Sequence, residues 1–232
     1  MKIEILYSEI GNLYGDNGNI RYLEKCLKDE KFYYTSINDT PHFVKEKIDF
    51  IYMGPMSEEN QEKTIIKLLP YKNRLKELIN NNTIFLCTGN SWEIFGKDIR
   101  NEDGTIIECL DIFDTYAKRY MLDRYAGLVL GTFKDIKIVG FKNQFTHSYG
   151  NNTNNYFLEV IKGSGLNPSS SLEGIHYKNF FGTYLLGPIL ILNPDFTKYL
   201  LSLLGIKNIT LPFEEEIYKT YNKRLEEFIN QV

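Results

Sequence analysis

Cys87 is the residue whose type and setting best suit covalent chemistry in this chain. The apolar run at 83–86 predicts a buried strand, and Trp92, Phe95 and Gly96 predict a short helix after it. A cysteine on the bend between them would lie at the carboxyl end of a strand, where open α/β sheets bind ligands. It would also face a helix N-terminus, which lowers a thiol pKa and can stabilise an oxyanion, so Cys87 is a candidate nucleophile. The alternative is a structural cysteine in this turn, because free cysteine is among the most buried residue types.

The composition argues against several other classes of function. The chain has 232 residues and a formal net charge of −3, and its Lys and Glu residues are spread along it without a basic block. Nothing in this pattern favours binding to nucleic acid or to an anionic membrane surface. The three cysteines, Cys26, Cys87 and Cys109, are odd in number and unevenly spaced, which favours a reducing cytoplasm over a disulfide framework.

Membrane insertion and secretion are not expected either. The longest apolar run, 184–192, is too short to span a bilayer and contains a Gly-Pro pair. The N-terminal run at 1–6 contains an acidic residue, so it favours a strand over a signal sequence. We therefore expect a soluble cytoplasmic protein.

The sequence up to Gly96 alternates strands and helices. Expected strands lie at 2–7, 32–37, 48–53 and in the run before Cys87. Expected helices follow the turn-rich segment 12–19, a capped start at Ser57, and Lys72. This alternation predicts an α/β fold with a mostly parallel central sheet and helices on both faces.

After Gly96 the sequence no longer alternates predicted strands and helices. Segments 105–109, 126–133 and 136–141 predict strands joined by turns, so we expect an additional antiparallel β segment, and the polar stretch 144–155 predicts an exposed loop. A further strand at 178–186 and helices from 193 and from 212 complete the expected elements. No repeat or long linker divides the chain, which predicts a single domain over 1–232.

Four stretches, taken in chain order, carry a specific pattern. They are Leu-Tyr-Gly-Asp-Asn-Gly-Asn-Ile at 13–20, Cys-Thr-Gly at 87–89, Val-Gly-Phe-Lys-Asn at 139–143, and the long stretch 173–188 that begins Glu-Gly-Ile-His-Tyr-Lys-Asn. Together they resemble the class I, triad-type glutamine amidotransferases with a cobyric-acid-synthase-like domain. Among these they look most like the glutaminase subunits of lipid II isoglutaminyl synthase. The fourth stretch is the most specific of the four.

The resemblance implies a flavodoxin-like fold and a set of site residues. Cys87 matches the nucleophile that attacks the glutamine amide to give a glutamyl thioester. Asp16 matches the acidic residue that completes or supports the triad, and Arg124 matches an arginine that helps to hold the substrate, beside Thr88 and Gly89 of the Cys87 motif. On local grounds Asp16 could instead cap the following helix, and Arg124 could form a surface ion pair.

The resemblance also implies partners. Family members pass ammonia from glutamine to a Mur-ligase-like, ATP-dependent subunit, with which a heterodimer is expected. That partner activates the D-glutamate carboxyl of lipid II, a peptidoglycan precursor. Neither a cofactor nor a metal is expected in the glutaminase subunit itself.

The chain departs from the family pattern at several positions of the catalytic motifs. Leu186 replaces the triad histidine of Gly-Thr-Tyr-Leu-His-Gly-Pro, and leucine cannot take or return a proton. Losing the base in a triad costs on the order of a millionfold in rate. Pro55 stands in a segment that is Gly-Gly-Gly in the family, and it removes a backbone donor. Lys142 replaces a glutamate, and the residues after Cys87 differ as well.

Three histidines, His42, His147 and His176, could replace the missing base. The family often carries a noncatalytic histidine at the position of His176, and His147 lies in the polar stretch that could fold over the site. Two hypotheses follow: a degenerate glutaminase that supports its partner, which then uses free ammonia or another nitrogen source, or an active glutaminase with an unrecognised base. A third, a cysteine hydrolase or thiol sensor, leaves the fourth stretch unexplained.

Overall fold

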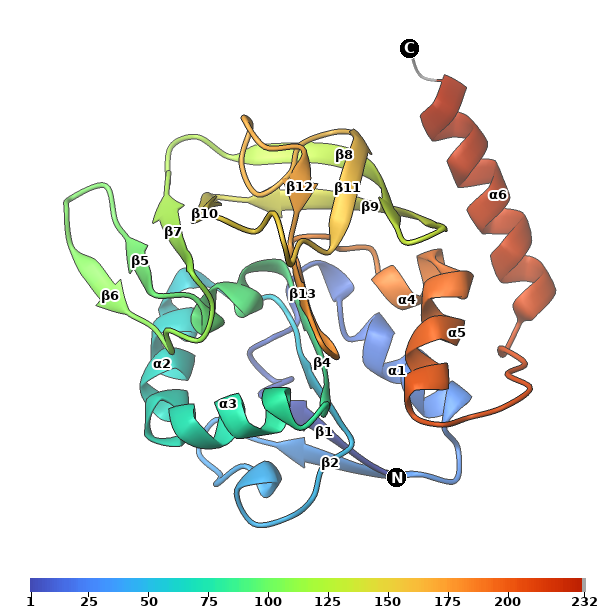
Figure 1. The fold of residues 1–232 in the computed structure, drawn as a ribbon, viewed down its shortest axis with the longest axis horizontal. Helices are drawn as coiled ribbons and strands as arrows, with labels where there is room; N and C mark the ends of the chain where they lie inside the picture. Colours follow the sequence, from blue (N-terminus) through green and yellow to red (C-terminus); the bar gives the residue numbers. More distant parts are fainter. Residues whose placement is uncertain (231–232) are drawn as a thin grey trace.

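A six-stranded sheet forms the centre of the computed structural model, which describes residues 1–230 (Figure 1). Its strands are β1 (Lys2–Leu6), β2 (Lys31–Thr35), β3 (Phe50–Met53), β4 (Ile84–Thr88), β13 (Ile175–Tyr177) and β14 (Phe180–Thr183). They lie in the order β13-β14-β4-β3-β1-β2, with β13 antiparallel to β14 and the other pairs parallel. The expected mostly parallel sheet is confirmed, and so is the strand expected within 178–186.

Helices cover both faces of this sheet (Figure 1). On one face lie α1 (Gly18–Cys26), α4 (Ile189–Leu192) and α5 (Pro194–Leu203), and on the other lie α2 (Glu58–Leu68), α3 (Lys72–Asn80) and the 3-10 helix η4 (Gly89–Phe95). Shorter 3-10 turns are η1 (Leu13–Gly15), η2 (His42–Val44) and η3 (Leu69–Tyr71). The predicted cap at Ser57 is confirmed, since its side chain accepts a hydrogen bond from the backbone N–H of Asn60.

Strand β4 is buried along its whole length because helices cover it from both sides. Its side chains alternate between two apolar cores. Phe85 and Cys87 belong to the core beside α2 and α3, whereas Ile84 and Leu86 belong to the core beside α1 and α5. A strand covered on both faces is expected to be continuously apolar, which accounts for the run that the sequence shows here.

Two four-stranded sheets form the additional β segment, which lies above the parallel sheet in Figure 1. Their strands are β5 (Asp98–Arg100), β6 (Ile106–Glu108), β7 (Thr115–Arg119), β8 (Tyr125–Phe133), β9 (Ile136–Gln144), β10 (Thr146–Gly150), β11 (Leu158–Lys162) and β12 (Leu172–Glu173). The strand orders are β10-β7-β5-β6 and β12-β11-β8-β9, and all pairs except β5–β7 are antiparallel. The expected antiparallel addition is therefore confirmed.

The prediction of an exposed loop at 144–155 is wrong for its first part. Strand β10 occupies Thr146–Gly150, and Thr146, His147 and Ser148 are buried. The sequence is polar here because the side chains find partners inside the protein. The hydroxyl of Ser148, for example, lies 2.6 Å from that of Tyr184.

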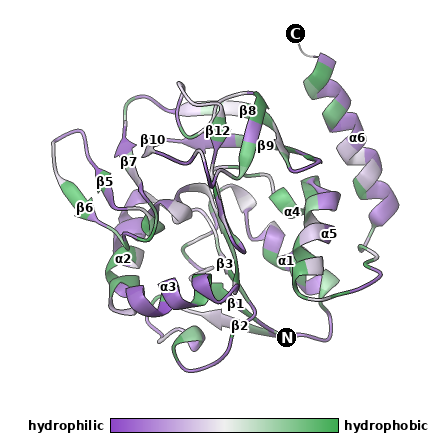
Figure 2. Ribbon diagram, viewed as in Figure 1, coloured by the Kyte–Doolittle hydropathy of each residue, from purple (hydrophilic) through white to green (hydrophobic). Residues whose placement is uncertain are grey.

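The last helix, α6 (Glu214–Asn230), packs Tyr221 and Phe228 against Leu130 and Val139 of β8 and β9. Many residues of α6 and of α3 are hydrophilic (Figure 2), and α6 confirms the helix expected from position 212. Residues 231–232 of the expected 1–232 domain lie outside the described part.

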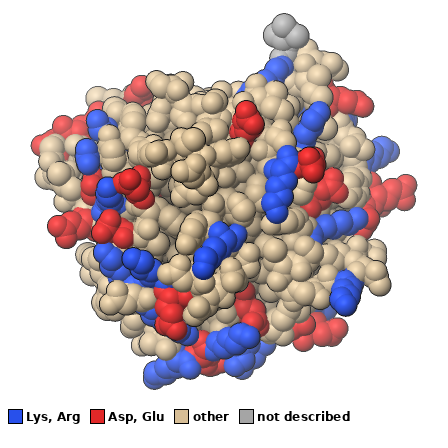
Figure 3. Space-filling view, in the orientation of Figure 1, with Lys and Arg blue, Asp and Glu red and all other residues tan. Residues whose placement is uncertain are grey.

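Charges of both signs are interspersed over the face drawn in Figure 3. Within residues 1–230, no helix combines the length and the apolar character that crossing a bilayer requires.

A fully buried ion pair links β9 and β12 within the β layer. The Nζ of Lys142 lies 3.7 Å from Oε1 of Glu173, and neither side chain is exposed. Lys142 also donates to the carbonyl oxygens of Ser164 and Gly165, at 2.9 and 2.5 Å. Burial lowers the pKa of Lys142 to about 8, although the carboxylate of Glu173 opposes this shift. Glu173 in turn accepts hydrogen bonds from the hydroxyl of Thr183, at the end of β14, and from the backbone N–H of Tyr184, which follows it.

Replacing one partner of this pair should destabilise the fold strongly. Lys142→Met would leave the carboxylate of Glu173 and two carbonyl oxygens buried without their cation, and we expect a loss of about 3–5 kcal/mol in the free energy of unfolding. Urea denaturation measures this loss. Lys137→Met changes an exposed lysine on the same strand and should stay within about 0.5 kcal/mol of the wild type. Equal stabilities of the two variants would contradict the importance of the pair.

Candidate functional site

A cavity of about 100 Å³ opens at the carboxyl edge of the parallel strands, and we call it the edge cavity. Its walls come from the segments that follow β1, β3, β4 and β14, together with the junction of β9 and β10. Ligands of open α/β sheets bind at this edge, so the edge cavity is where the chemistry of the fold is expected. Gly89, Pro55, Leu186 and Gln144 are among the residues that line it.

The side chain of Cys87 does not line the edge cavity. Cys87 lies inside β4, is fully buried, and belongs to the apolar core that also contains Met53 and Trp92. The prediction that Cys87 lies on the strand-to-helix bend is therefore wrong, because the strand continues through Thr88 and the bend begins at Gly89. Burial raises the pKa of the Cys87 thiol, whereas the expected position facing a helix N-terminus would have lowered it. The nucleophilic role of Cys87 stays a prediction.

Leu186 is one of the residues that line the edge cavity. Its side chain is buried, and its backbone pairs with Phe141 of β9 through N–H to O distances of 2.9 and 3.3 Å. An apolar side chain, held in place by this pairing with β9, therefore forms this part of the cavity wall.

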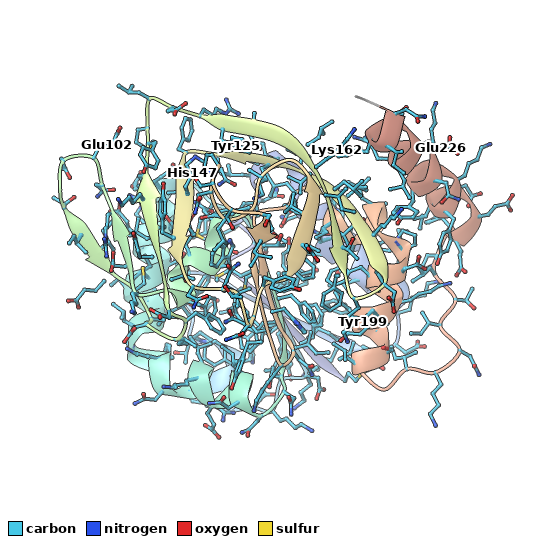
Figure 4. The ribbon with its side chains drawn as sticks, turned by 45° about the horizontal axis from the view of Figure 1, so that its top comes forward. Glu102, Tyr125, His147, Lys162, Tyr199 and Glu226 are labelled. Atoms are coloured by element: carbon cyan, nitrogen blue, oxygen red, sulfur yellow. The ribbon has the colours of Figure 1, made fainter. Side chains whose placement is uncertain are left out.

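The three histidines pack away from the edge cavity. His42 stacks on Tyr33 with ring centroids 4.1 Å apart, and His176 stacks on Phe181 at 4.7 Å. His147 lies in β10 beside Tyr125 of β8, as Figure 4 shows, with ring centroids 5.8 Å apart. None of them lines the edge cavity in the part of the chain that the structure describes.

Asp16 lies at the centre of a buried polar cluster at the end of β4. Its carboxylate accepts hydrogen bonds from the hydroxyls of Tyr52 and Thr88, and from the side-chain amide of Asn19 at 3.1 Å. Burial raises the pKa of Asp16 to about 6, and the three hydrogen bonds only partly oppose this shift. The cap interpretation is wrong, because these are side-chain bonds and α1 starts after Asn17 without a side-chain cap.

The other predicted site residues divide between this cluster and the edge cavity. The hydroxyl of Thr88 is turned toward Asp16, whereas Gly89 lines the edge cavity. Arg124 is exposed, and its Nε donates to Oδ1 of Asn143 at 2.5 Å while its guanidinium lies 5.7 Å from the ring centroid of Phe145. Asn143 and Phe145 both line the edge cavity, which places Arg124 at its rim.

Several buried polar residues near the edge cavity did not stand out in the sequence. Glu93 of η4 accepts hydrogen bonds from the hydroxyl of Tyr184 at 2.6 Å and from Nε2 of Gln61 at 2.7 Å, and burial raises its pKa. Arg119 donates to Oε1 of the same Gln61 at 2.9 Å. The one available signal was an acidic residue within the apolar run 92–95.

Gln144 is the other polar residue of note. It is 8% exposed and lines the edge cavity, and its Oε1 has no hydrogen-bond partner within residues 1–230. In the same part of the chain, no group of three His, Cys, Asp or Glu side chains is arranged to hold a metal ion. Apolar side chains, amides, hydroxyls and the carboxylate of Glu58 line the edge cavity, and no histidine or cysteine of residues 1–230 does.

Comparison with known protein families identifies the family of this chain. The profile of the CobB/CobQ-like glutamine amidotransferase domain matches residues 2–193. The chain belongs to this family. The resemblance carried by the four stretches is thereby confirmed.

Two curated relatives match over most of their length. The lipid II isoglutaminyl synthase (glutamine-hydrolyzing) subunit GatD of Staphylococcus aureus is 33% identical over 208 residues, which cover 88% of this chain and 83% of the relative. The subunit of the same name in Streptococcus pneumoniae is 28% identical over 235 residues, with 94% and 86% covered.

Solved structures agree on the fold. A glutamine amidotransferase from Thermotoga maritima has a TM-score of 0.53 at 12% identity, with 96% of this chain and 92% of that chain covered. Another glutamine amidotransferase has a TM-score of 0.56 at 10% identity, with 88% and 99% covered. At these identities the structural likeness supports the α/β amidotransferase fold alone.

The raised pKa of Asp16 predicts a specific dependence of stability on pH. Folding shifts this pKa from 3.8 to about 6, so the folded protein favours the protonated carboxyl. Its contribution to stability is full below pH 3.8 and is lost as the pH rises through about 6. An asparagine at this position would never ionise. As the pH rises from 4 to 7.5, the free energy of unfolding of Asp16→Asn should therefore increase by up to about 3 kcal/mol relative to that of the wild type.

Thermal denaturation of both proteins across this range measures the difference. The exposed Asp29→Asn serves as the matched control for the removal of a surface carboxylate. If the Asp16→Asn difference is the same at both ends of the range, Asp16 is not a buried carboxyl of raised pKa.

Proposed function

We propose that this chain is the GatD-like subunit of a complex that amidates the D-glutamate of lipid II. Its partner would be a Mur-ligase-like, ATP-dependent subunit, and the complex would work in the cytoplasm. Two named GatD relatives that match over most of the chain support this assignment. The specific stretch 173–188, which forms β13, β14 and the adjoining wall of the edge cavity, supports it as well.

We also infer that the subunit hydrolyses glutamine poorly or not at all. The observation that carries this inference is Leu186, which lines the edge cavity at the motif position of the triad histidine. A leucine can neither accept the proton of a thiol nor return it to leaving ammonia. The burial of Cys87, which raises its thiol pKa, adds to the defect because thiolate is the reactive form.

The alternative is an active glutaminase in which Cys87 forms the thioester with an unrecognised base. The packing of His42, His147 and His176 away from the edge cavity argues against it. Under our proposal the subunit supports its partner through binding. The nitrogen would then come from free ammonia.

The nitrogen source separates these two functions. The purified complex of this chain with its Mur-ligase-like partner should amidate lipid II with ATP and ammonium chloride, but not with ATP and glutamine. Mass spectrometry of the product measures amidation, and Cys87→Ala should leave the ammonium-dependent activity unchanged. Glutamine-dependent amidation that is lost in Cys87→Ala would overturn the impaired hydrolysis. Failure of the two proteins to co-purify would overturn the complex.

Restoring the base alone should not restore hydrolysis. Leu186→His returns an imidazole to the edge cavity, but Cys87 remains inside β4 and outside that cavity. We expect ammonia release from glutamine to stay at the background level of the wild type in a coupled assay. Turnover by Leu186→His that disappears in Leu186→His/Cys87→Ala would show that the histidine was the only defect.

A further inference from the structure

The strand-to-helix turn after β4 is where this type of site presents a nucleophile. In α/β enzymes the nucleophile sits on a sharp, strained turn, so that its side chain projects above the sheet. Strand β4 ends at Thr88 and η4 begins at Gly89, whose φ is +58°. This left-handed conformation is strained for residues other than glycine, and Gly89 also lines the edge cavity.

The direction of a side chain at position 89 identifies what it would face. A Cβ atom on Gly89 would lie 3.4 Å from Cδ2 of Leu186, the residue at the motif position of the histidine. A nucleophile at position 89 and a base at position 186 would therefore be in contact across the edge cavity. This chain has a glycine and a leucine at these two positions.

Pro55 closes the space that such a nucleophile would need. The same Cβ atom would lie 2.4 Å from Cβ of Pro55 and 3.3 Å from its Cα. The first distance is far shorter than two carbon atoms allow, so no side chain fits at position 89 while Pro55 keeps its place. Pro55 stands in the segment that is Gly-Gly-Gly in the family, so the two departures fit one another.

Cys87 lies two residues before the bend at Gly89, so it does not occupy the position of a nucleophile on that bend. Its side chain shares the face of β4 that carries Phe85 and lies in the core beside α2 and α3. Thr88, between Cys87 and Gly89, is turned to the opposite side, toward Asp16. The chain therefore reaches the edge cavity at Gly89.

We propose that Gly89 occupies the nucleophile position of this fold and that Cys87 is a core residue. The edge cavity then lacks both the nucleophile and the base, and Pro55 fills the space of the nucleophile. This inference deepens the proposed impairment of hydrolysis and does not depend on the partner subunit. All of its tests use the isolated chain, so they can fail or succeed independently of the amidation of lipid II.

Thiol alkylation with iodoacetamide, followed by peptide mapping, tests the inference. In alkylation the thiolate sulfur bonds to the methylene carbon and iodide leaves, so the rate reports access and ionisation of each cysteine. In the native wild type, Cys87 should react at least about 100-fold more slowly than in urea, because it is fully buried. Reaction of native Cys87 within tenfold of its rate in urea would overturn the proposal.

A second variant tests the assignment of Gly89. Pro55→Gly/Gly89→Cys opens the space and places a thiol on the bend, which should react at least about tenfold faster than Cys87 in the same molecule. Addition of Leu186→His should increase its rate further near neutral pH, because an imidazole next to a thiol promotes thiolate formation. A thiol at position 89 that is no more reactive than Cys87 would overturn the assignment.

Pro55→Gly alone is the matched control, since it opens the same space without adding a thiol. Cys87 should remain unreactive in it, which separates a new reactive thiol from loosening of the core. Fast labelling of Cys87 in Pro55→Gly would mean that Cys87 lies one proline away from the edge cavity, and would contradict its assignment as a core residue. The labelling of Cys87 in the wild type and in Pro55→Gly therefore decides whether Cys87 is a core residue, even if the variants that carry a cysteine at position 89 do not fold.

Discussion

Strand β4 lies between β3 and β14 and is covered by helices on both faces, so the alternation of its side chains decides what each residue of the site can do. Along a strand, successive side chains point to opposite faces. Cys87 therefore enters the core beside α2 and α3, and Thr88 turns to Asp16 on the other side. The edge cavity is reached where the strand ends, at Gly89.

Buried polar contacts stabilise the carboxyl edge of the parallel sheet, independently of any catalytic role. Asp16, Thr88 and Tyr52 fix the end of β4 against the segment after β1. The pair of Lys142 and Glu173 fixes the segment after β14 against the β layer. Because a buried polar group is costly to leave unpaired, each of these contacts contributes to the stability of the fold whether or not the site is catalytic.

The layered fold could be predicted because it depends on local patterns. Strand and helix alternation gave the parallel sheet, and the Ser57 cap gave the start of α2. The family could also be predicted, because the stretch 173–188 around Leu186 is specific. The structure adds that this leucine lines the edge cavity.

The details of the site could not be predicted because they depend on contacts between distant segments. The run 83–88 is β-rich to its end, so nothing local marks the bend after Thr88 rather than at Cys87. The sequence of β10 is polar like that of an exposed loop, but in the fold its polar side chains are satisfied by partners such as Tyr184. The sequence of 13–20 is likewise compatible with a helix cap at Asp16. The partners of its carboxylate, Tyr52 and Thr88, are distant in sequence and are brought to it only by the fold.

The ionisation of Cys87 tests the central claim most directly. The ultraviolet absorbance of thiolate can be followed with pH in the wild type and in Cys87→Ser, and the difference isolates this thiol. The account predicts that Cys87 stays protonated through the range in which an ordinary thiol of pKa about 8.5 ionises, because burial raises its pKa. A Cys87 thiolate that forms at or below about pH 7 would contradict the account, since it would mark an activated nucleophile.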